Sequence, residues 1–384
     1  MNAAHRATNS APQQLHDVGQ RLWLDNITRT LLSSGTLARY IKNSAVTGLT
    51  SNPTIFDQAV KSGGDYTAAI RAKARQGKSG EALFFEIAVE DLTSAADLFR
   101  PIFDASHGID GWVSLEVSPL LAHDSSGTVR AAKGLHDLAQ RPNFFVKIPG
   151  TPSGITAIEE TIFAGVPVNV TLLFSREHYL AAADAYMRAI ERRIAAGLDP
   201  KVASVASIFV SRWDSAVRER VSSEFHNRLG IAIAMRAYKA YRDLLASPRW
   251  QTLARAGAEP QRLLWASTGS KDPASSDTLY IEALAAPDTI NTIPEKTLLA
   301  FADHGKVKNI LPPDGGYAEA VIAEFTREGI DDEALADELQ REGTAAFEKS
   351  WGDLMSRIKV ACAASAMDSS GDEPGHVSAT ADGA

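Results

Sequence analysis

Short apolar segments rich in β-branched residues recur along the chain, and longer amphipathic segments separate them. The short segments have the length and composition of β-strands. They cover residues 21–24, 45–49, 112–117, 144–148, 167–172, 204–209, 262–266 and 288–291. The longer segments are rich in alanine and repeat their apolar residues at helical spacing, so the chain alternates predicted strands with predicted helices.

Several of the longer segments show the helical pattern clearly. Within residues 85–99, apolar side chains recur every three or four positions and share one helical face: Phe85, Val89, Leu92, Ala96 and Phe99. Residues 177–196 repeat the pattern with Leu180, Ala183, Met187, Ile190 and Ile194. The segment from about residue 316 onward is also helical, and Asp331 is a predicted N-cap. Its apolar residues are expected to pack back on the rest of the domain: Leu335, Leu339, Phe347, Trp351, Leu354 and Ile358.

Strands that alternate with helices form βαβ units and a parallel sheet. Eight such strands predict an α/β fold, the (β/α)8 or TIM barrel, with additional N- and C-terminal helices. A doubly wound open sheet is the main alternative, but no G-x-G-x-x-G motif follows any predicted strand. No linker divides the interior, so residues 15–365 are predicted to form one barrel domain with a C-terminal helical extension. Residues 1–14 are expected to be a flexible arm, and residues 366–384 a disordered tail.

The composition is that of an ordinary globular protein, with 45% apolar and 22% charged residues. A net charge of −8 without a basic cluster argues against nucleic-acid binding. The chain has no apolar stretch of the ~18 residues that a membrane span needs, and no secretory signal, so a cytoplasmic location is expected. Cys362 is the only cysteine, and the nine histidines lack metal-binding spacing, so neither a disulfide, a metal nor a cofactor is expected. The sequence leaves open whether the protein is a monomer or a homodimer.

Polar residues interrupt the predicted strands or follow them directly. In a barrel of this kind the active site is built at the C-terminal ends of the strands, so these positions are candidate site residues. In chain order they are Asp25, Asn52, Glu116, Lys147, Asn169, Thr171, Ser207, Arg212, Ser267 and Lys271. All of them are expected at one mouth of the barrel.

Lys147 lies between Val146 and Ile148 in a predicted buried strand. An ammonium group there is costly to bury unless it is paired with a carboxylate or loses its proton. A neutral amine inside a barrel is the nucleophile with which a Schiff-base enzyme attacks a ketone. The alternative is an ion pair with Glu116 or Asp25 that has only a structural role.

The carboxylates of Asp25 and Glu116 favour the catalytic interpretation of Lys147. Schiff-base formation moves protons onto and off the carbinolamine oxygen, and carbon–carbon cleavage needs a base for a hydroxyl proton. Two carboxylates on different strands at the same mouth can supply these roles. The structural alternatives are a helix cap for Asp25 and a charge partner for Glu116.

Arg212, Ser267 and Lys271 follow the sixth and seventh predicted strands. Barrels often bind a phosphate group at this place, where arginine offers a forked donor and lysine a point charge. The alternative is that Arg212 and Lys271 are solvated loop charges. The negative net charge does not forbid an anionic ligand, because screening beyond ~8–10 Å leaves the local residues in control.

Motifs of these segments resemble those of the transaldolase family, in the family's order and over most of residues 20–272. They are LDN at 24–26, GLTSNPT at 48–54, SLEVS at 114–118, VKIPGT at 146–151, NVTLLFS at 169–175 and ASIFVSR at 206–212. The length of the chain and the WASTG stretch at 265–269 resemble the longer bacterial subfamily.

The resemblance implies a barrel that transfers a dihydroxyacetone unit in the non-oxidative pentose phosphate pathway. The donor would be sedoheptulose 7-phosphate or fructose 6-phosphate, and the acceptor glyceraldehyde 3-phosphate or erythrose 4-phosphate. Lys147 would form the Schiff base, and Asp25 would be the base for carbon–carbon cleavage. Glu116 would be the acid/base that acts through a water near Thr171.

The same resemblance implies the roles of the binding residues. Asn52 and Asn169 would hold substrate hydroxyls, and Ser207 would help to position the dihydroxyacetone unit. Arg212 and Ser267 would bind the phosphate group.

One phosphate contact departs from the pattern of the shorter transaldolases. They place an arginine shortly after the serine that matches Ser267, whereas Thr268 and Gly269 stand here. Lys271 can supply that charge from a slightly longer loop.

Two further functions compete with transaldolase. Fructose 6-phosphate aldolases use the same lysine but release free dihydroxyacetone, and they tend to carry Tyr and Gln where this chain has Phe209 and Glu116. Both positions favour transfer over such a class I phosphosugar aldolase. An inactive barrel that only binds a ligand is the third possibility, and the joint presence of Lys147, Glu116 and Asp25 argues against it.

Overall fold

The computed structural model describes residues 10–370. Eight parallel strands close into a barrel in sequence order, which confirms the predicted (β/α)8 fold. The strands are β1 (Arg21–Asp25), β2 (Val46–Thr50), β3 (Val113–Glu116), β4 (Phe144–Pro149), β5 (Val168–Leu173), β6 (Ser204–Phe209), β7 (Arg262–Ala266) and β8 (Ile290–Ile293).

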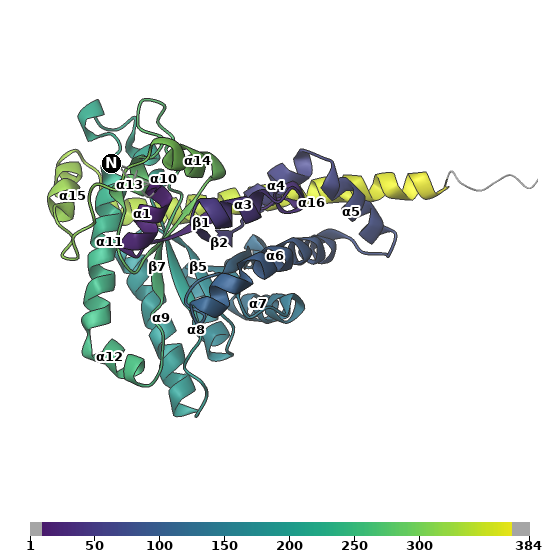
Figure 1. Ribbon diagram of the computed structural model, residues 1–384, viewed down its shortest axis with the longest axis horizontal. Helices are drawn as coiled ribbons and strands as arrows, with labels where there is room; N and C mark the ends of the chain where they lie inside the picture. The colour runs from purple at the N-terminus through teal and green to yellow at the C-terminus, as the bar shows by residue number, and fades with distance from the viewer. Residues whose placement is uncertain (1–9, 371–384) are drawn as a thin grey trace, which may run out of the picture.

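Helices surround the barrel and connect its strands (Figure 1). Those before β5 are α1 (Ala11–Val18), α2 (Arg29–Ser33), α3 (Thr36–Asn43), α4 (Pro53–Lys61), α5 (Asp65–Ala74), α6 (Gly80–Ala105), the 3-10 helix η1 (Pro119–Leu121), α7 (Ser125–Ala139) and α8 (Pro152–Phe163). Those after β5 are α9 (Arg176–Ala195), α10 (Ser211–Val217), the 3-10 helix η2 (Ser223–Phe225), α11 (Leu229–Ala246), α12 (Pro248–Arg255), α13 (Leu279–Ala283), α14 (Glu295–His304), α15 (Ala318–Arg327) and α16 (Asp332–Ser370). Within residues 10–370, none of these helices is long and apolar enough to cross a membrane.

The interior of the barrel changes from apolar to polar along the strands. At the N-terminal end, large buried side chains belong to one cluster: Trp23, Phe145, Val205, Leu264 and Ile290. Because side chains alternate along a strand, the residue two positions further on points to the same side. Those residues are Asp25, Lys147, Ser207, Ala266 and Thr292. An apolar floor therefore supports a largely polar layer at the C-terminal ends of the strands.

Gly48 in β2 makes room for the largest side chain of this floor. A Cβ atom at position 48 would lie 2.5 Å from Nε1 of Trp23, too close for any other residue. The same Nε1 donates a hydrogen bond of 2.9 Å to Asp110, so the buried indole has its polar partner.

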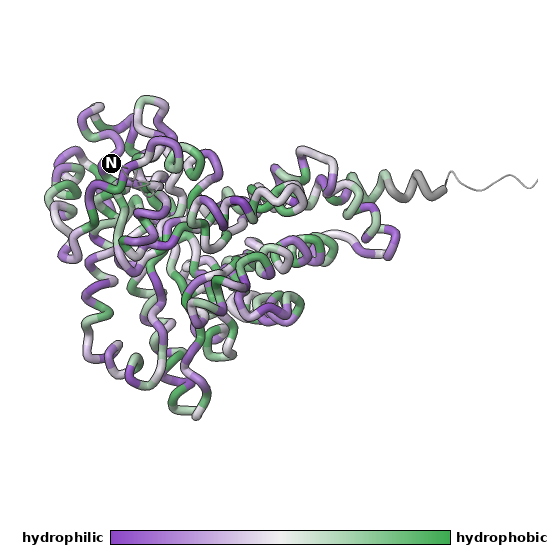
Figure 2. Tube along the Cα trace, in the orientation of Figure 1, coloured by the Kyte–Doolittle hydropathy of each residue, from purple (hydrophilic) through white to green (hydrophobic). Residues whose placement is uncertain are grey.

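The long helix α16 leaves the barrel and runs beside α4, α5 and α6 (Figure 1). Asp331 caps its start, because Oδ1 of Asp331 accepts a 3.0 Å hydrogen bond from the backbone N–H of Ala334. The apolar face predicted for this segment is buried: Leu335, Leu339, Phe347, Trp351, Leu354 and Ile358. Hydrophobic and hydrophilic residues alternate along the outer helices in Figure 2, as expected for amphipathic helices that cover a core.

The ends of the domain differ from the sequence-based boundaries. Residues 11–14 are not a flexible arm but the first turn of α1, in which Ala11 and Leu15 are buried. Alanine and glutamine are good helix formers, and Pro12 is well tolerated in a first turn, so composition concealed the helix. Residues 1–9 lie outside the described residues. Helix α16 runs to Ser370, past the predicted start of the tail at residue 366, and residues 371–384 lie outside the described residues.

Two local predictions were shifted. Ala183, Met187 and Ile190 of the stripe predicted for α9 are buried, together with Tyr179 and Tyr186, whereas Leu180 is 38% exposed. The last strand begins at Ile290 and not at residue 288. Asp288 has a φ of 61°, a left-handed conformation that does not fit in a strand.

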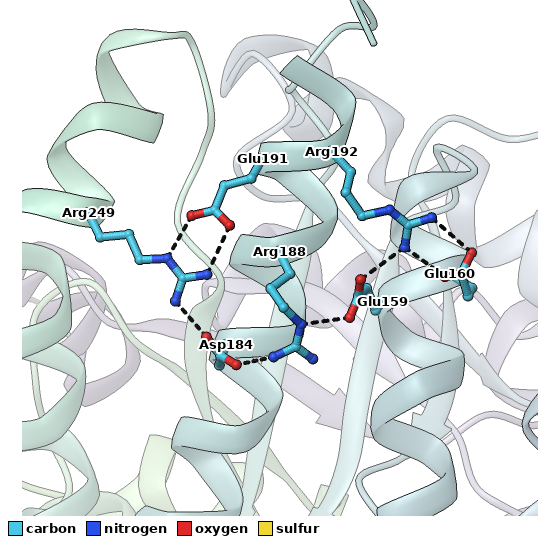
Figure 3. A network of polar contacts seen from close by, with 7 residues as sticks. All are labelled: Glu159, Glu160, Asp184, Arg188, Glu191, Arg192 and Arg249. Carbon is cyan, nitrogen blue, oxygen red and sulfur yellow. Dashed lines mark hydrogen bonds and ion pairs between the residues drawn. The ribbon is translucent and has the colours of Figure 1, made fainter. Parts of the chain in front are cut away.

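A row of alternating arginines and carboxylates joins α8, α9 and α12 on the outside of the barrel (Figure 3). In order along the row, its members are Glu160, Arg192, Glu159, Arg188, Asp184, Arg249 and Glu191. Each arginine contacts two carboxylates, and the arginine side chains remain 38–40% exposed. We call this row the outer ion ladder.

Candidate active site

A cavity of about 510 Å³ opens at the C-terminal ends of the strands. Nine of the ten candidate site residues line it: Asp25, Asn52, Lys147, Asn169, Thr171, Ser207, Arg212, Ser267 and Lys271. The tenth, Glu116, contacts one of these residues from the neighbouring strand, because its Oε2 lies 3.5 Å from Nζ of Lys147. The fold thus brings together residues that are up to 246 positions apart, from Asp25 to Lys271.

Strand register places Lys147 at the centre of this group. Parallel pairing sets Glu116 of β3 beside Lys147 on one side and Asn169 of β5 on the other. Nζ of Lys147 donates a 2.9 Å hydrogen bond to the carbonyl oxygen of Ser51, and only 7% of the side chain is exposed. The amine is therefore held in place while it lines the cavity.

Asp25 ends β1 and lies in a largely enclosed place. Its Oδ1 accepts a 2.9 Å hydrogen bond from Thr50, whose hydroxyl also lies 2.6 Å from that of Thr292. Burial raises the pKa of the Asp25 carboxyl above its usual value, although the nearby Lys147 opposes the shift. The N-cap of α2 is Thr28, so the helix-cap alternative for Asp25 is wrong.

Glu116 is more deeply buried than Asp25, because only 5% of it is exposed. Burial raises the pKa of its carboxyl above the usual range, although Lys147 opposes the shift. Among the described residues, neither Oε2 of Glu116 nor the buried hydroxyl of Thr171 has a hydrogen-bond partner. A carboxyl with a raised pKa exchanges protons closer to neutral pH, which general acid–base chemistry requires.

Amide and hydroxyl groups from β5, β6 and the residues that follow β2 also line the cavity. Asn169 donates a 3.1 Å hydrogen bond to Ser114 and accepts one of 2.8 Å from Ser207, so its amide orientation is fixed. Asn52 is the N-cap of α4, where its Oδ1 accepts a 3.0 Å hydrogen bond from Ile55 N–H. The cap engages the amide oxygen of Asn52 and leaves the amide nitrogen for a ligand.

Arg212 lies where an anion can reach it. Its guanidinium carbon is 5.3 Å from the ring centroid of Phe209 and 6.0 Å from that of Phe347. Burial lowers the pKa of Arg212, and within residues 10–370 the guanidinium forms no salt bridge with a carboxylate. The charges of Glu342 and Glu116 act on Arg212 from a distance and oppose the shift. A partly buried cation with no carboxylate in direct contact, on the wall of a cavity, is suited to a phosphate group.

The loop after β7 completes this end of the cavity. Ser267 adopts a left-handed φ of 53°, and its hydroxyl lies 2.9 Å from that of Ser211. The side chain of Lys271 lines the same cavity from an exposed position. The next residue, Asp272, is held by Arg218 at 3.0 Å and by Asn227 at 2.8 Å, which fixes the loop that carries Lys271.

Sequence reasoning missed the contribution of α16 to the site. Phe347 lines the cavity and contacts Arg212, although it lies on the helix that was expected only to cover the barrel. Its spacing is that of any residue on an apolar helical face, so the local pattern held no signal for this role.

Histidine, cysteine and carboxylate side chains are the residues that could hold a metal ion. Among residues 10–370, no group of three or more His, Cys, Asp and Glu side chains lies close enough to hold a metal ion.

Comparison with known proteins gives a consistent result. The sequence model of the family "Transaldolase/Fructose-6-phosphate aldolase" matches residues 22–358. A transaldolase of Parafrankia sp. is 45% identical over 355 residues, which cover 90% of this chain and 96% of that protein. A transaldolase of Saccharopolyspora erythraea is 44% identical over 359 residues, 92% of this chain and 98% of that protein. A transaldolase of Thiobacillus denitrificans is 43% identical over 349 residues, 89% of this chain and 97% of that protein.

Proposed function

The chain belongs to the transaldolase/fructose-6-phosphate aldolase family, and from this premise we propose how its cavity carries out the transaldolase reaction. The enzyme is a transferase that moves a dihydroxyacetone unit from a ketose phosphate to an aldose phosphate. The donors are sedoheptulose 7-phosphate and fructose 6-phosphate, and the acceptors are glyceraldehyde 3-phosphate and erythrose 4-phosphate, as in the non-oxidative pentose phosphate pathway. The observation that carries the proposal is the Lys147 amine, which lines the cavity 3.5 Å from a buried carboxyl group.

Lys147 is the nucleophile of the first step. Its neutral amine attacks the keto carbon of the donor and forms a carbinolamine, which loses its hydroxyl as water to give the imine. The apolar floor lies below Lys147, and the hydrogen bond from Nζ of Lys147 to Ser51 fixes the position of the amine along the barrel axis. The amine is thereby oriented toward the bound ketone before the reaction begins.

Glu116 supplies and removes the protons of this step. A protonated carboxyl delivers a proton to the leaving hydroxyl, and the carboxylate recovers one when the imine is hydrolysed. Oε2 of Glu116 and the hydroxyl of Thr171 are both buried without a hydrogen-bond partner among the described residues. A water molecule that bridges them would satisfy both atoms and carry the proton to the substrate.

Asp25 is the base for carbon–carbon cleavage. Of the two carbons joined by the bond that breaks, one carries a hydroxyl and departs; Asp25 takes the proton of this hydroxyl, so that the departing carbon becomes the carbonyl of the aldose product. The electrons of the broken bond enter the imine and form an enamine on Lys147. The enamine then attacks the aldehyde carbon of the acceptor, and Asp25 returns its proton to the new hydroxyl.

The remaining wall holds the hydroxyl groups of the sugar. The fixed amide of Asn169 and the hydroxyl of Ser207 face the dihydroxyacetone unit, and Asn52 lies on the other side of the cavity. These groups orient the reacting carbons relative to Lys147.

Arg212, Ser267 and Lys271 bind the phosphate group of the donor. Arg212 offers its forked N–H groups, because Phe209 and Phe347 contact the guanidinium and no carboxylate engages it in the described chain. Lys271 replaces the arginine of shorter transaldolases as a point charge, from a loop that Asp272 fixes.

Phe209 and Glu116 favour transfer over the release of free dihydroxyacetone. The test is product analysis with fructose 6-phosphate, in the presence and absence of erythrose 4-phosphate. We expect sedoheptulose 7-phosphate and glyceraldehyde 3-phosphate when the acceptor is present, and almost no free dihydroxyacetone when it is absent. Dihydroxyacetone release at a similar rate in both reactions would instead identify an aldolase.

We also propose a cytoplasmic location. Support comes from the presence of one cysteine among 384 residues, which is the usual composition in a reducing compartment. Fractionation of the producing cells, with detection of the native protein, tests this location.

A further inference from the structure

Gln340 connects α16 to the C-terminal ends of β4 and β5 in a way that the apolar packing of the helix does not require. Its Nε2 donates one hydrogen bond of 3.1 Å to the carbonyl oxygen of Gly150 and another of 2.9 Å to that of Leu172. Gln340 is only 8% exposed, and these contacts span 190 and 168 positions of the chain. Both donors of one side-chain amide are thus used on the ends of two strands.

The two carbonyl groups lie directly beside the catalytic positions. Gly150 follows β4, three positions after Lys147, and Leu172 follows Thr171 in β5. Gly150 N–H also donates a 2.7 Å hydrogen bond to the carbonyl oxygen of Thr171. The ends of β4 and β5 and the amide of Gln340 therefore form one hydrogen-bonded unit.

Leu172 has a backbone conformation that needs such support. Its φ is 57°, in the left-handed region that a leucine rarely adopts, and the pairing of β5 with β6 is irregular between Val170 and Leu173. A conformation of this kind persists only when the surrounding structure fixes it. The bond from Gln340 to the Leu172 carbonyl is such a constraint, and it acts one residue from Thr171.

The close approach of α16 at this point depends on a glycine. A Cβ atom at Gly343 would lie 2.9 Å from Cδ2 of Leu172 and 3.1 Å from Nη1 of Arg212. Gln340, Gly343 and Phe347 are three and four positions apart, so they share one face of the helix. This face meets the mouth of the barrel.

We propose that Gln340 is a positioning residue for the reaction. Through its two hydrogen bonds it holds the ends of β4 and β5 so that the hydroxyl of Thr171 stays aligned with Lys147 and Glu116. The inference rests on the proposed function, in which Thr171 and Glu116 share the proton-carrying water. Loss of the bonds should slow the proton-transfer steps and leave phosphate binding nearly unchanged.

The first test compares Gln340→Met with wild type in the coupled assay of fructose 6-phosphate and erythrose 4-phosphate. Methionine keeps the shape and volume of glutamine but has no N–H donors. We expect kcat to fall about 10-fold, with KM for fructose 6-phosphate within about 2-fold. The control is Thr344→Val one turn later, because within residues 10–370 the buried hydroxyl of Thr344 bonds only to its own helix, to the Gln340 carbonyl at 2.9 Å. It should keep kcat within about 2-fold of wild type.

A double-mutant cycle with Thr171→Val separates positioning from general destabilisation. If Gln340 acts through Thr171, Gln340→Met should lower kcat less than about 2-fold in the Thr171→Val background. The inference is overturned if Gln340→Met leaves kcat of the otherwise wild-type enzyme unchanged. It is equally overturned if the full loss recurs when Thr171 is already replaced.

Gln340→Glu provides a second variant if the methionine variant does not fold. Its carboxylate lacks donors at neutral pH, whereas the protonated acid can donate one hydrogen bond. The ratio of variant to wild-type kcat should therefore rise as the pH is lowered, and a constant ratio contradicts the inference. These results are distinguishable from failure of the proposed function, because in that case the wild-type enzyme itself would not transfer the dihydroxyacetone unit.

Discussion

Two regions of this barrel, the cavity and the outer ion ladder, bring acidic and basic side chains together, and the pKa values of these side chains are shifted in opposite directions. In the cavity, burial raises the pKa of the Asp25 and Glu116 carboxyls and lowers that of the Arg212 guanidinium. All three shifts disfavour the charged form. The basic group closest to these carboxyls is the Lys147 amine, whose Nζ lies 3.5 Å from Oε2 of Glu116.

In the outer ion ladder, the pKa shifts favour the charged forms of the side chains. The hydrogen bonds that Arg192 donates to Glu160 and Glu159 raise the pKa of its guanidinium. For Glu159, burial acts to raise the pKa, but the hydrogen bonds from Arg188 and Arg192 outweigh it and lower the value. Every shift here favours the charged form, and the arginines remain 38–40% exposed to solvent.

The difference shows where the reactive groups lie. A charge that is paired at the surface gains little stability, and its partners hold it in the ionised form, so it does not exchange a proton near neutral pH. A group that is buried without enough partners is destabilised in its charged form, and it can gain that free energy back when a substrate binds or a proton moves. The same residue types therefore stabilise the outer layer weakly but carry out chemistry in the cavity.

The largest expected effect comes from removal of the amine in the cavity. Lys147→Ala should lower transfer between fructose 6-phosphate and erythrose 4-phosphate by about 10⁴-fold or more, because no imine can form. The coupled assay measures this loss, with circular dichroism as the control for folding. Turnover close to the wild-type rate would contradict the claim that the cavity holds the reactive groups, because Lys147 would then be only a structural partner of Glu116.

Asp25→Asn tests whether the carboxyl that supports activity also lowers the stability of the folded protein. We expect kcat to fall about 10²- to 10³-fold, because the base for carbon–carbon cleavage is lost. At neutral pH the variant should also unfold at a higher temperature, since the buried charge is gone; about 1 kcal/mol corresponds to ~2 °C. Thermal unfolding from pH 3 to 8 and steady-state kinetics measure the two effects.

The pH dependence follows from the sign of the shift. The pKa of Asp25 is higher in the folded protein than in the unfolded chain, so the native carboxyl holds its proton more tightly. The stability that this proton adds to the folded state is fully present below the pKa of Asp25 in the unfolded chain. It is lost as the pH rises through the higher pKa of Asp25 in the folded protein. The variant should therefore match wild type in acid and exceed it at neutral pH. A variant that is less stable than wild type at pH 8 contradicts this account.

Arg212→Ala tests the unpaired cation. KM for fructose 6-phosphate should rise by about 10- to 100-fold, because one charge-assisted contact with the phosphate is lost. Donors without a phosphate group should be affected little. Equal effects on both kinds of donor would mean that Arg212 supports the fold and does not bind phosphate.

Lys271→Ala should have a smaller effect of the same kind. Because the side chain is exposed, its contact with the phosphate is screened, and we expect KM to rise about 3-fold at low salt and less at 0.5 M salt. Kinetics at two ionic strengths provide the measurement. An unchanged KM at low salt would show that Lys271 is a solvated loop charge.

Arg249→Ala in the outer ion ladder should have the smallest effect. It removes contacts with Asp184 and Glu191, yet exposed ion pairs contribute at most about 1 kcal/mol. Chemical denaturation and the coupled assay should show a small loss of stability and unchanged kinetics. A large loss of activity would show that the ladder and the cavity are coupled.

The strands and the positions of the site residues could be predicted because both follow from local patterns. Short apolar runs marked the strands, and a single polar residue within a run, such as Lys147, marked the point where the barrel interior becomes polar. Register then brought Glu116 and Asn169 beside Lys147, which needed only the parallel order of the strands.

Contacts between distant segments could not be predicted in this way. Gln340 and Phe347 lie on an ordinary amphipathic helix, and nothing in its spacing shows that this face meets the ends of β4 and β5. The predicted face of α9 was correct for Ala183, Met187 and Ile190, but it omitted Tyr179 and Tyr186, whose rings are buried despite their hydroxyl groups. The boundary at residues 11–14 failed because helix propensity and loop composition overlap there.

The most direct test of the account is to trap the imine. The wild-type enzyme is incubated with fructose 6-phosphate, reduced with borohydride and digested, and the peptides are mapped by mass spectrometry. We predict a reduced sugar adduct on the peptide that contains Lys147, and no such adduct in Lys147→Ala. An adduct on a different lysine, or none at all in an enzyme that transfers dihydroxyacetone, would contradict the central role of Lys147.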